Sequence, residues 1–530
     1  MKYQFHILKM NTKRFFSAKN ILATAVLLLS ASAHQATAQT GNDALRFAQR
    51  DPGFTVKSMG LGGTSSAGIA DGAAFITNPA GLAWAKSSLL SGSFTSMLAT
   101  DRGAFDAGSG RTAVEDELTS SGLGNLSYLF KVPTSRGSMV VGASFSEVAS
   151  FDRSLFFDGE NGLNSVTDFF IPFSNEFTLE DDGDGGVFPN FSRTLSFIAF
   201  ETFAIDMDAD LIDAGDLIPF LPAVSAGTIA QTGFVEESGK MRELNFGGAA
   251  EVAQNVMVGV SLNIPFGSYE FRRVLEEDDF LNHNDGTGGT TDFSFLHFSE
   301  NFESDLVGVN LRFGLSAQVN ENLRLGAGIE TPTYYSIEDN FHTLLETEFD
   351  NGDFFSYGDA PDQLAGSGTF DYNLTTPWKV TAGGAYTLRD WKFYGDLEVI
   401  DWAQMELDSD GFTFEDENDA IRRSLKGVVN VRLGASYDLN DWQFRAGVGA
   451  YPDAHSTEFA LNGFPDIDRE RTFASAGVGY SINEKASIDV AWMAEQFDDR
   501  YDLYNEVVDA PFVVEEVTRN RFQIGFSYAF

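Results

Sequence analysis

The 530-residue sequence contains no cysteine, only six histidines, and 35 basic against 77 acidic side chains. The absence of cysteine excludes disulfides, thiolate metal sites, cysteine nucleophiles and a lipid-anchored cysteine. The formal net charge of −42 argues against a nucleic-acid partner, because binding to phosphates requires an excess of lysine and arginine. Beyond the N-terminal leader, no run approaches the roughly 18 apolar residues of a transmembrane helix, so we expect none.

The N-terminus has the layout of a secretory signal peptide. Basic residues precede an apolar core at 21–29, and an Ala-Thr-Ala sequence at 36–38 matches the small-residue pattern of a cleavage site. We therefore expect export, with residues 1–38 removed as a signal peptide.

Strict alternation of apolar and polar residues is the most abundant pattern in the sequence. In the last ten residues, five apolar side chains share one parity: Phe522, Ile524, Phe526, Tyr528 and Phe530. This period-2 pattern predicts a strand with one apolar face and one hydrated face. The ending resembles the C-terminal strand of bacterial outer-membrane barrels, which implies that Phe530 is a signal read by the barrel-insertion machinery.

The positions of turns predict the number of strands. Six tight connections, each flanked by alternating runs, lie at 133–137, 253–255, 320–322, 388–390, 439–441 and 483–485. Long acidic stretches separate the hairpins, at about 153–240, 275–303, 347–365, 409–422, 454–470 and 501–514. With a first strand near 88–100 and a last near 515–530, we predict an all-β fold, a 14-stranded antiparallel transmembrane β-barrel over 88–530.

The connection at about 153–240 is predicted to be a large extracellular loop. Residues 227–239 within it also alternate like a strand. Counting them as a further span would move the next long loop to the side of the short turns. We therefore interpret 227–239 as part of the folded excursion, paired with the top of the next strand.

The segment before the barrel does not alternate. Residues 39–87 are rich in Gly and Ala and include the sequence Asn78-Pro79-Ala80-Gly81. Small residues allow backbone segments to pack closely, and the lumen of a barrel this size stands open unless something fills it. We therefore expect residues 39–87 to form an N-terminal hatch, or plug, in the lumen.

The Gly-rich stretch, the Ala70-Asp71 pair, the Asn-Pro-Ala sequence and the aromatic C-terminus together resemble the FadL/TodX family of outer-membrane transporters for long-chain fatty acids and other hydrophobic compounds. The resemblance implies that Asn78, Pro79, Ala80 and Gly81 form the hatch motif. It also implies an apolar ligand pocket near the hatch.

The same resemblance implies lateral release of ligand through the barrel wall, beside a kinked strand. That strand corresponds to 138–152 here. Gly142 is the only glycine within its 139–150 core, and glycine is where a strand bends or fails to pair. Gly142 is therefore the predicted kink and lateral opening.

The large loop contains an apolar stretch at 195–205. Family members capture ligand first in an apolar groove between extracellular loops, so Phe197, Phe200 and Phe203 are candidates for a ligand-capture loop. The same three side chains are equally suited to forming the core of the loop itself, and both interpretations stay open.

Charged residues on the predicted lumen side offer a further choice. Arginines at 312, 324, 432 and 445 share this face with acids at 330, 396 and 398. We favour a polar network that holds the plug over a charged permeation path, and the two are compatible.

Catalysis and metal binding have little support. The histidines after the leader lie in predicted loops or at strand tops, without a nearby nucleophile-elbow serine: His283, His297, His342 and His455. Residues 181–186 resemble the start of a calcium loop, but Ser192 stands where the EF-hand pattern requires Glu. We expect no enzyme activity, no cofactor and no metal.

Two functions from different classes remain. The first is passive uptake of hydrophobic molecules, such as long-chain fatty acids, across the outer membrane of a Gram-negative-type bacterium. The second is a role as a component or shuttle of a surface protein secretion or assembly system. Expected partners are outer-membrane lipid, a hydrophobic small-molecule ligand and, during biogenesis, the barrel-insertion machinery, and we expect a monomer.

Overall fold

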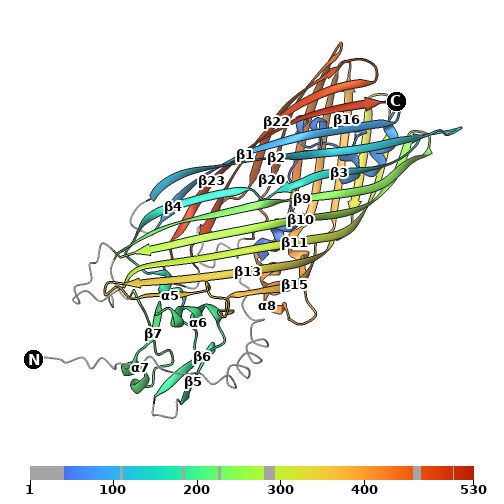
Figure 1. Cartoon of the computed structure of the whole chain (residues 1–530). Coiled ribbons are helices and arrows are strands. Elements are labelled where there is room, and N and C mark those ends of the chain that lie inside the picture. The colour runs from blue at the N-terminus through green and yellow to red at the C-terminus, as the bar shows by residue number, and fades with distance from the viewer. Residues whose placement is uncertain are drawn as a thin grey trace, which may run out of the picture.

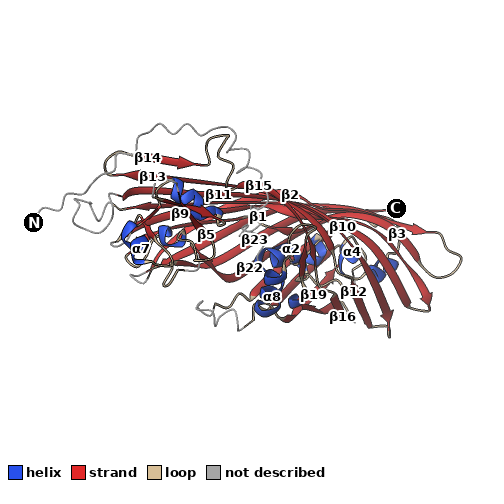
Figure 2. Cartoon of the chain, turned by 90° about the horizontal axis from the view of Figure 1, so that it is seen from below, coloured by secondary structure: helices blue, strands red, loops and turns tan. Residues whose placement is uncertain are grey.

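The computed structural model describes residues 41–67, 69–107, 111–181, 186–224, 228–279, 293–456, 467–504 and 507–530. Antiparallel strands form one closed barrel, and short helices of the N-terminal segment lie among them (Figures 1 and 2). The expected signal peptide at 1–38 lies outside the described residues.

Fourteen spans make up the wall, and several consist of two strands in line. In chain order they are β1 (Leu89–Asp106), β2 (Arg111–Val132), β3 (Met139–Ser150) with β4 (Arg153–Asn161), β9 (Ile229–Ala253), β10 (Val256–Asp278), β11 (Phe293–Gln318), β12 (Leu323–Glu330) with β13 (Tyr334–Phe349), β15 (Ser367–Thr375) with β16 (Lys379–Leu388), β17 (Trp391–Asp401) with β18 (Glu406–Asp408), β19 (Gly427–Leu439), β20 (Trp442–Tyr451), β21 (Arg471–Ser481), β22 (Ala486–Asp502) and β23 (Phe512–Ala529). The prediction of a 14-stranded antiparallel barrel is confirmed.

The last strand closes the barrel against the first. The ladder between them runs from Leu89↔Ala529 to Asp106↔Phe512. Its end is extended by a hydrogen bond of 3.1 Å from the Phe530 backbone N–H to the Ser88 carbonyl. The junction that closes the barrel therefore joins the C-terminus to the strand that directly follows the hatch segment.

The short connections lie at the predicted positions. Asn255, Arg389 and Asn440 stand at three of them with positive φ angles of 63°, 55° and 52°. Asparagine tolerates this left-handed conformation better than most residues, which explains its use in tight hairpins.

The outer face carries a belt of exposed apolar side chains near the short turns. On β11 these side chains, 39–52% exposed, are Val307, Val309, Leu311, Phe313 and Leu315. Glu303 and Asp305 lie on the same face of this strand, further from the short turns, and are also exposed. Because a barrel's lipid-facing band is about 25 Å tall and a strand rises about 3.4 Å per residue, the 26-residue strand extends well beyond this belt.

Short elements make up the rest of the fold. The hatch segment contains α2 (Gly41–Ala48), α3 (Val56–Gly60), α4 (Ala73–Thr77) and the 3-10 helix η2 (Pro79–Trp84). The connection between β4 and β9 contains α5 (Val166–Phe169), β5 (Phe177–Asp181), β6 (Val187–Phe191), α6 (Thr194–Glu201), β7 (Ile205–Met207), α7 (Ala209–Ala214) and β8 (Phe220–Pro222). Elsewhere lie β14 (Phe354–Tyr357), η3 (Trp402–Gln404) and α8 (Glu415–Ser424). No helix in the described ranges is long and apolar enough to cross a membrane.

The large excursion is shorter than predicted. Residues 153–161 form β4, which pairs with β9 from Arg153↔Glu237 to Asn161↔Ile229. From Ile229 onward, the segment that we assigned to the excursion is therefore the upper part of β9. It adds no further span, as predicted, but it lies in the wall because it is continuous with the next strand. The excursion proper sits at the end of the barrel remote from the C-terminus (Figure 1).

Candidate functional site

The predicted hatch motif lies against the inner wall of the barrel. The side chain of Asn78 is fully buried, and its Nδ2 donates to the carbonyls of Ser66 at 2.7 Å and Leu315 at 3.0 Å. Its Oδ1 accepts from the Ala80 N–H at 3.1 Å and so caps η2, whose first residue is Pro79. Asn78 thus joins two parts of the N-terminal segment to β11.

Glycines of the wall make room for this motif. A Cβ atom on Gly314 would lie 2.0 Å from Asn78 Oδ1, and one on Gly259 would lie 2.4 Å from the Ala80 nitrogen. A Cβ on Gly326 would lie 2.1 Å from the Ser66 carbonyl oxygen. Three neighbouring strands, β10, β11 and β12, therefore present bare backbone where the N-terminal segment approaches. A Cβ atom on Gly81 of the motif would lie 3.1 Å from the Ile69 carbonyl oxygen, so Gly81 packs against this carbonyl.

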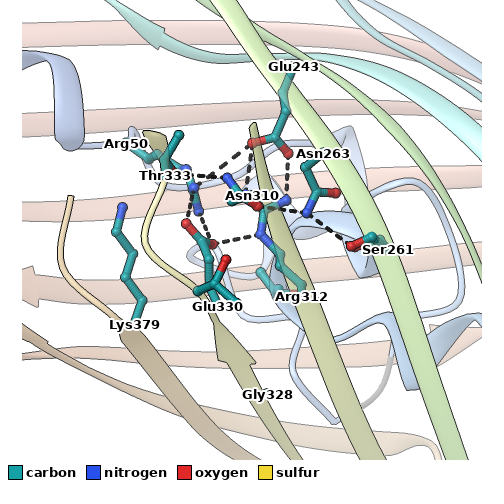
Figure 3. Close-up of polar contacts among 12 residues, drawn as sticks. Arg50, Glu243, Ser261, Asn263, Asn310, Arg312, Gly328, Glu330, Thr333 and Lys379 are labelled. Carbon is teal, nitrogen blue, oxygen red and sulfur yellow. Dashed lines mark hydrogen bonds and ion pairs between the residues drawn. The ribbon is translucent and has the colours of Figure 1, made fainter. Parts of the chain in front are cut away.

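A buried network of charges joins the hatch segment to the wall (Figure 3). Arg50 makes two contacts with Glu330, at 2.8 and 2.5 Å. Arg312 donates to Glu330 at 2.6 Å and to both oxygens of Glu243, at 2.5 and 2.8 Å. Nearby, the ammonium of Lys379 donates to the Ala48 carbonyl at 2.8 Å. Bidentate arginine–carboxylate pairs have a fixed geometry, so they hold the segment in one position.

The predicted lumen charges are mostly paired, though not always with the expected partner. Arg312 pairs with Glu330, and Arg432 lies 3.8 Å from Glu398. Arg445 pairs with Asp489 at 2.7 Å, an acid that we did not single out. The remaining two contacts involve the hatch segment directly. Arg324 stacks over the Trp84 ring at 4.0 Å, and Asp396 accepts from the backbone of Ser65 and Ser66.

Asp51 ties the hatch segment to two parts of the wall. Its backbone N–H donates to the Val148 carbonyl at 2.9 Å, and its carboxylate accepts from the Ser150 N–H at 3.1 Å. The same carboxylate pairs with Arg471 at 2.8 Å. Burial on its own raises the pKa of Asp51, but the positive charges of Arg521, Arg471 and Arg519 outweigh it and lower the pKa below its usual value. Asp51 is therefore a buried anion at neutral pH.

The wall has an interrupted ladder between β2 and the span formed by β3 and β4. β2 pairs with β3 only from Val132↔Met139 to Asn125↔Ser146. Above that point, residues 111–123 pair with β1 alone, while β3 and β4 continue along β9. We call this unpaired stretch of the wall the seam. It lies at the upper edge of the apolar belt: Leu123 is exposed there, and on the same face, further from the short turns, the exposed residues include Glu115 and Glu117.

Gly142 is not the site of this irregularity, contrary to prediction. It pairs with Leu129 on one side and with Gly247 on the other. The register shift lies at Val148, and the strand itself breaks at Phe151 and Asp152. The role of Gly142 is close packing, since a Cβ there would lie 2.3 Å from the Tyr128 carbonyl oxygen. The bulge at Val148 contains no glycine, so the position of the one glycine in this strand did not predict it.

The mouth of the seam is occupied by an ion pair. Lys240 of β9 lies 3.2 Å from Glu147 of β3, and both side chains are largely buried. A Cβ atom on Gly122 of β2 would lie within 3.7 Å of both charged groups. This ion pair lies on the edge formed by β3 and β9, whereas the Ser154 hydroxyl of β4 donates across the seam to the Asp116 carboxylate of β2 at 2.6 Å. The two edges thus meet through side chains rather than through backbone hydrogen bonds.

An apolar cluster lies between the hatch segment and the extracellular end. Phe47 of α2 packs edge-on against Phe151 and Tyr269, with ring centroids 6.0 and 5.7 Å apart. Phe54 and Val148 belong to the same cluster of buried residues. This cluster lies beside the hatch segment and includes Phe151 at the strand break.

The three phenylalanines of the large excursion separate into two environments. Phe197 packs edge-on against Tyr357 at 5.5 Å, and Phe200 lies 5.5 Å from Phe191 within the excursion's own core. Phe203 is 45% exposed, and its ring lies 4.5 Å from that of Phe355. The structure therefore does not gather them on one surface.

Phe530 lies at the end with the short turns. Its ring is 51% exposed and stacks on Tyr128 at 5.9 Å, beside the junction of first and last strands. The acidic stretch at 182–185 and His283 lie outside the described residues, and the described part of the chain contains no group of three or more metal-ligating side chains.

Sequence reasoning missed the residues that seat the hatch segment. Gly259, Gly314 and Gly326 occupy lumen-facing positions of consecutive strands, and that shared parity was the available signal. Asp51 and Arg50 precede the Gly-rich stretch and carried no motif that would distinguish them from solvated charges.

The fold and this arrangement define the class: a bacterial outer-membrane β-barrel whose lumen holds its own N-terminal segment. Comparison with known proteins identifies the family. The model of the family "Outer membrane protein transport protein (OMPP1/FadL/TodX)" matches residues 229–506, and the chain belongs to this family. The protein is thus a member of a family of transport channels.

Individual relatives match over shorter stretches. The long-chain fatty acid transport protein of Escherichia coli K12 is 28% identical over 185 residues, which cover 33% of this chain and 39% of that protein. The corresponding Salmonella typhi protein is 31% identical over 126 residues, covering 23% and 28%. A crystal structure of a Pseudomonas aeruginosa FadL homologue superposes with a TM-score of 0.53 at 13% identity, over 91% of this chain and 99% of that one. It shows the same fold.

Proposed function

We propose that the protein mediates passive uptake of hydrophobic molecules across the outer membrane, with long-chain fatty acids as the favoured cargo. The observation that carries the proposal is the seam, an interrupted stretch of wall beside β2 that adjoins an apolar cluster. A complete ladder offers no sideways exit, whereas the seam is a stretch of wall, at the upper edge of the apolar belt, that no backbone hydrogen bonds close. The relatives named as long-chain fatty acid transport proteins support the choice of cargo.

The proposed route has three stages. An apolar molecule enters at the extracellular end, binds among the aromatic rings around Phe47 and Phe151, and leaves through the seam near Glu147. Residues 39–87 act as the hatch that closes the periplasmic half of the lumen, with Asn78, Pro79, Ala80 and Gly81 as its seat on the wall.

Burial of the chain supplies the binding free energy. Each CH2 removed from water contributes about 0.8 kcal/mol, so a C16 chain gains roughly 12 kcal/mol before its loss of freedom is subtracted. Movement down a concentration gradient then needs no nucleotide or other energy source.

A cross-linking experiment tests the route. The chain has no cysteine, so Gly122→Cys with Glu147→Cys places two unique thiols across the seam. A short bifunctional thiol reagent should bridge them and reduce uptake of radiolabelled palmitate by cells that lack their own long-chain fatty acid channel.

The matched control places thiols on a regular ladder. Gln496→Cys and Thr518→Cys are directly paired on β22 and β23, and the same reagent there should leave uptake unchanged. Full uptake after complete cross-linking of the seam pair would refute lateral release. Failure of the unmodified protein to restore uptake at all would refute the transport function.

A second candidate function is a role as shuttle or component in surface protein secretion or assembly. One observation favours it: apolar side chains at the extracellular end are strongly exposed, with Leu217 at 78%, Leu364 at 72% and Val508 at 83%. Exposed apolar side chains that lie together on one surface mark contact with a partner or a ligand. Stoichiometric co-purification of a secreted protein, lost after replacing these three residues by Ser, would support this function over uptake.

A further inference from the structure

The interrupted wall leaves one side of β2 without a neighbouring strand. Residues 113–121 pair with β1, but no strand of the described chain pairs with their other side. Exposed and half-buried residues alternate along this segment, so that both of its faces reach solvent. We call residues 113–121 the free edge.

Every second residue of the free edge directs its backbone groups away from β1. In an antiparallel ladder, the N–H and C=O of one residue point to the same side, and successive residues point to opposite sides. The Ser120 carbonyl accepts from the Ser96 hydroxyl of β1 at 3.4 Å, whereas the Glu117 N–H donates to the Asp116 carboxylate at 2.9 Å. The odd-numbered residues therefore present their N–H and C=O groups at the free edge: Ala113, Glu115, Glu117, Thr119 and Ser121.

The free edge lacks the usual protection of an exposed strand. Proline, lysine, bulges and covering segments normally prevent other chains from pairing with such an edge. Residues 113–121 contain neither proline nor lysine, and the bulge of this ladder lies below them, at Gly124. β4 packs on the inner face of the hairpin, where a Cβ on Gly103 would lie 3.2 Å from the Phe156 carbonyl oxygen, but its ladder is with β9. The free edge is therefore a regular template for a further strand.

Two acids on the outer face determine which partner fits this template. Glu115 and Glu117 are exposed on the same face, and neither has an ion-pair partner among the described residues. Arg102, which lies opposite Glu115 on β1, pairs instead with Glu516. Opposite charges on directly opposed residues stabilise a ladder, and like charges destabilise it. A second copy of the chain is disfavoured, because the register with the greatest overlap places Glu117 opposite Glu117.

We propose that the free edge is a docking site for an extended, basic segment of an extracellular protein, which adds to β2 as an antiparallel strand. Backbone hydrogen bonds to the odd-numbered residues supply affinity, and Lys or Arg at every second position, opposite Glu115 and Glu117, supplies specificity. The free edge lies on the extracellular side of the apolar belt, because its outward side chains beyond Leu123 are small, polar or acidic. This site does not depend on the proposed uptake function.

Peptides with altered backbones test strand addition. The full-length protein in phosphatidylcholine nanodiscs is titrated with a fluorescent peptide of alternating lysine and threonine, and binding to empty nanodiscs is subtracted. A lysine opposite Glu117 directs its own N–H toward β2, so methylation of the lysine backbone nitrogens should lower affinity at least about tenfold. Methylation of the threonine nitrogens, which point away from β2, should change affinity by less than about threefold. A peptide of alternating glutamate and threonine should not bind.

Variants of the protein separate the edge from its charge. Thr119→Pro removes one N–H at the free edge and leaves the β1 ladder intact, so it should lower peptide affinity about fivefold relative to Thr119→Ala. Glu115→Gln combined with Glu117→Gln retains the edge and should weaken binding by roughly three- to tenfold.

A matched control removes the same charge from a fully paired strand. Glu303 and Asp305 are exposed on the outer face of β11, which pairs there with both β10 and β13. Glu303→Gln combined with Asp305→Asn should leave peptide affinity unchanged. Retained fold is verified for every variant by the mobility shift on heating that folded barrels show in gels.

Hydrogen exchange supplies a residue-by-residue readout. The peptide should slow exchange at the Glu115 and Thr119 amides at least about tenfold and leave the Leu118 amide, which faces β1, unchanged. Equal affinity for the two methylated peptides, equal affinity in Thr119→Pro and Thr119→Ala, or no binding of the unmodified peptide overturns the docking site. Protection of Glu115 and Thr119 that appears without peptide and rises with protein concentration identifies a second copy as the occupant and also overturns it. In each case the uptake function stands.

Discussion

Replacing Gly314 by alanine should dislodge the hatch while leaving the barrel intact. The new Cβ atom would lie 2.0 Å from Asn78 Oδ1 and 2.7 Å from the Ala80 nitrogen. Ordinary contacts of this kind begin at 3.4 Å, so Asn78 must retreat by roughly 1.4 Å. Because Ala80 contributes backbone rather than a flexible side-chain tip, rotation of a side chain alone does not relieve the overlap.

The size of the expected effect follows from the contacts that Asn78 loses when it moves away from Gly314. Forcing an extra methyl into a packed site costs about 1–3 kcal/mol. The hydrogen bonds from Asn78 to the Ser66 and Leu315 carbonyls are then strained or lost, and each buried acceptor left unsatisfied costs about 1–3 kcal/mol more. Even about 3 kcal/mol raises the population of undocked hatch more than a hundredfold.

Hydrogen exchange in peptides covering residues 60–84 measures this population directly, and electrical conductance in planar bilayers reports whether the lumen opens. The matched control is Gly384→Ala on the outer face of β16, where the nearest neighbour of the new Cβ lies at 3.5 Å. Exchange in the Gly314→Ala hatch should exceed that in the control by at least tenfold. Equal exchange in the two variants would refute the account of the hatch seat.

Three further outcomes are expected. Leu311→Arg in the middle of the apolar belt should destabilise the folded barrel by about 2–4 kcal/mol in urea titrations, whereas Glu303→Arg above the belt should have little effect. Glu243→Gln leaves buried Arg312 short of a partner and should cost about 3–5 kcal/mol in the same assay. Asp51 has a lowered pKa, so its contribution to hatch docking is present above the ordinary aspartate pKa of about 4 and is lost as pH falls through the lowered value. Protease protection of the hatch should therefore differ between wild type and Asp51→Asn at pH 7 and converge at low pH, and a constant difference would contradict this.

Much of the wall was predictable from local pattern. Alternation with a period of two fixes which side chains face lipid, and Asn at tight turns marks where strands reverse, as at Asn255 and Asn440. These signals come from neighbouring residues in the sequence, so they are recognised without knowing which strands pair with each other. They did not place Ile229–Gly239 correctly: its alternation was recognised, but it was assigned to the excursion because a further span would have moved the next long loop to the side of the short turns, whereas it is the upper part of β9.

The candidate site was predictable only where a motif marked it. The Asn-Pro-Ala sequence pointed to Asn78, but nothing in the sequence connects Asp51 with Arg471 or Arg519, which lie more than four hundred residues away. The kink was misplaced for a related reason. A glycine indicates where a strand is able to bend, whereas the seam arises because β3 follows β9 and leaves β2, which is a matter of pairing.

The sequence by itself determined the barrel, its strand count and the presence of a compact segment before it, because alternation, turn chemistry and small-residue content are properties of neighbouring residues. Only the tertiary structure decided where the wall is interrupted and which charges meet inside it. Closing the ring brings the beginning and the end of the chain together, so that Asp51 reaches Val148 on one side and Arg471 on the other. Contacts of that kind depend on the register and closure of the whole sheet, which no local pattern encodes.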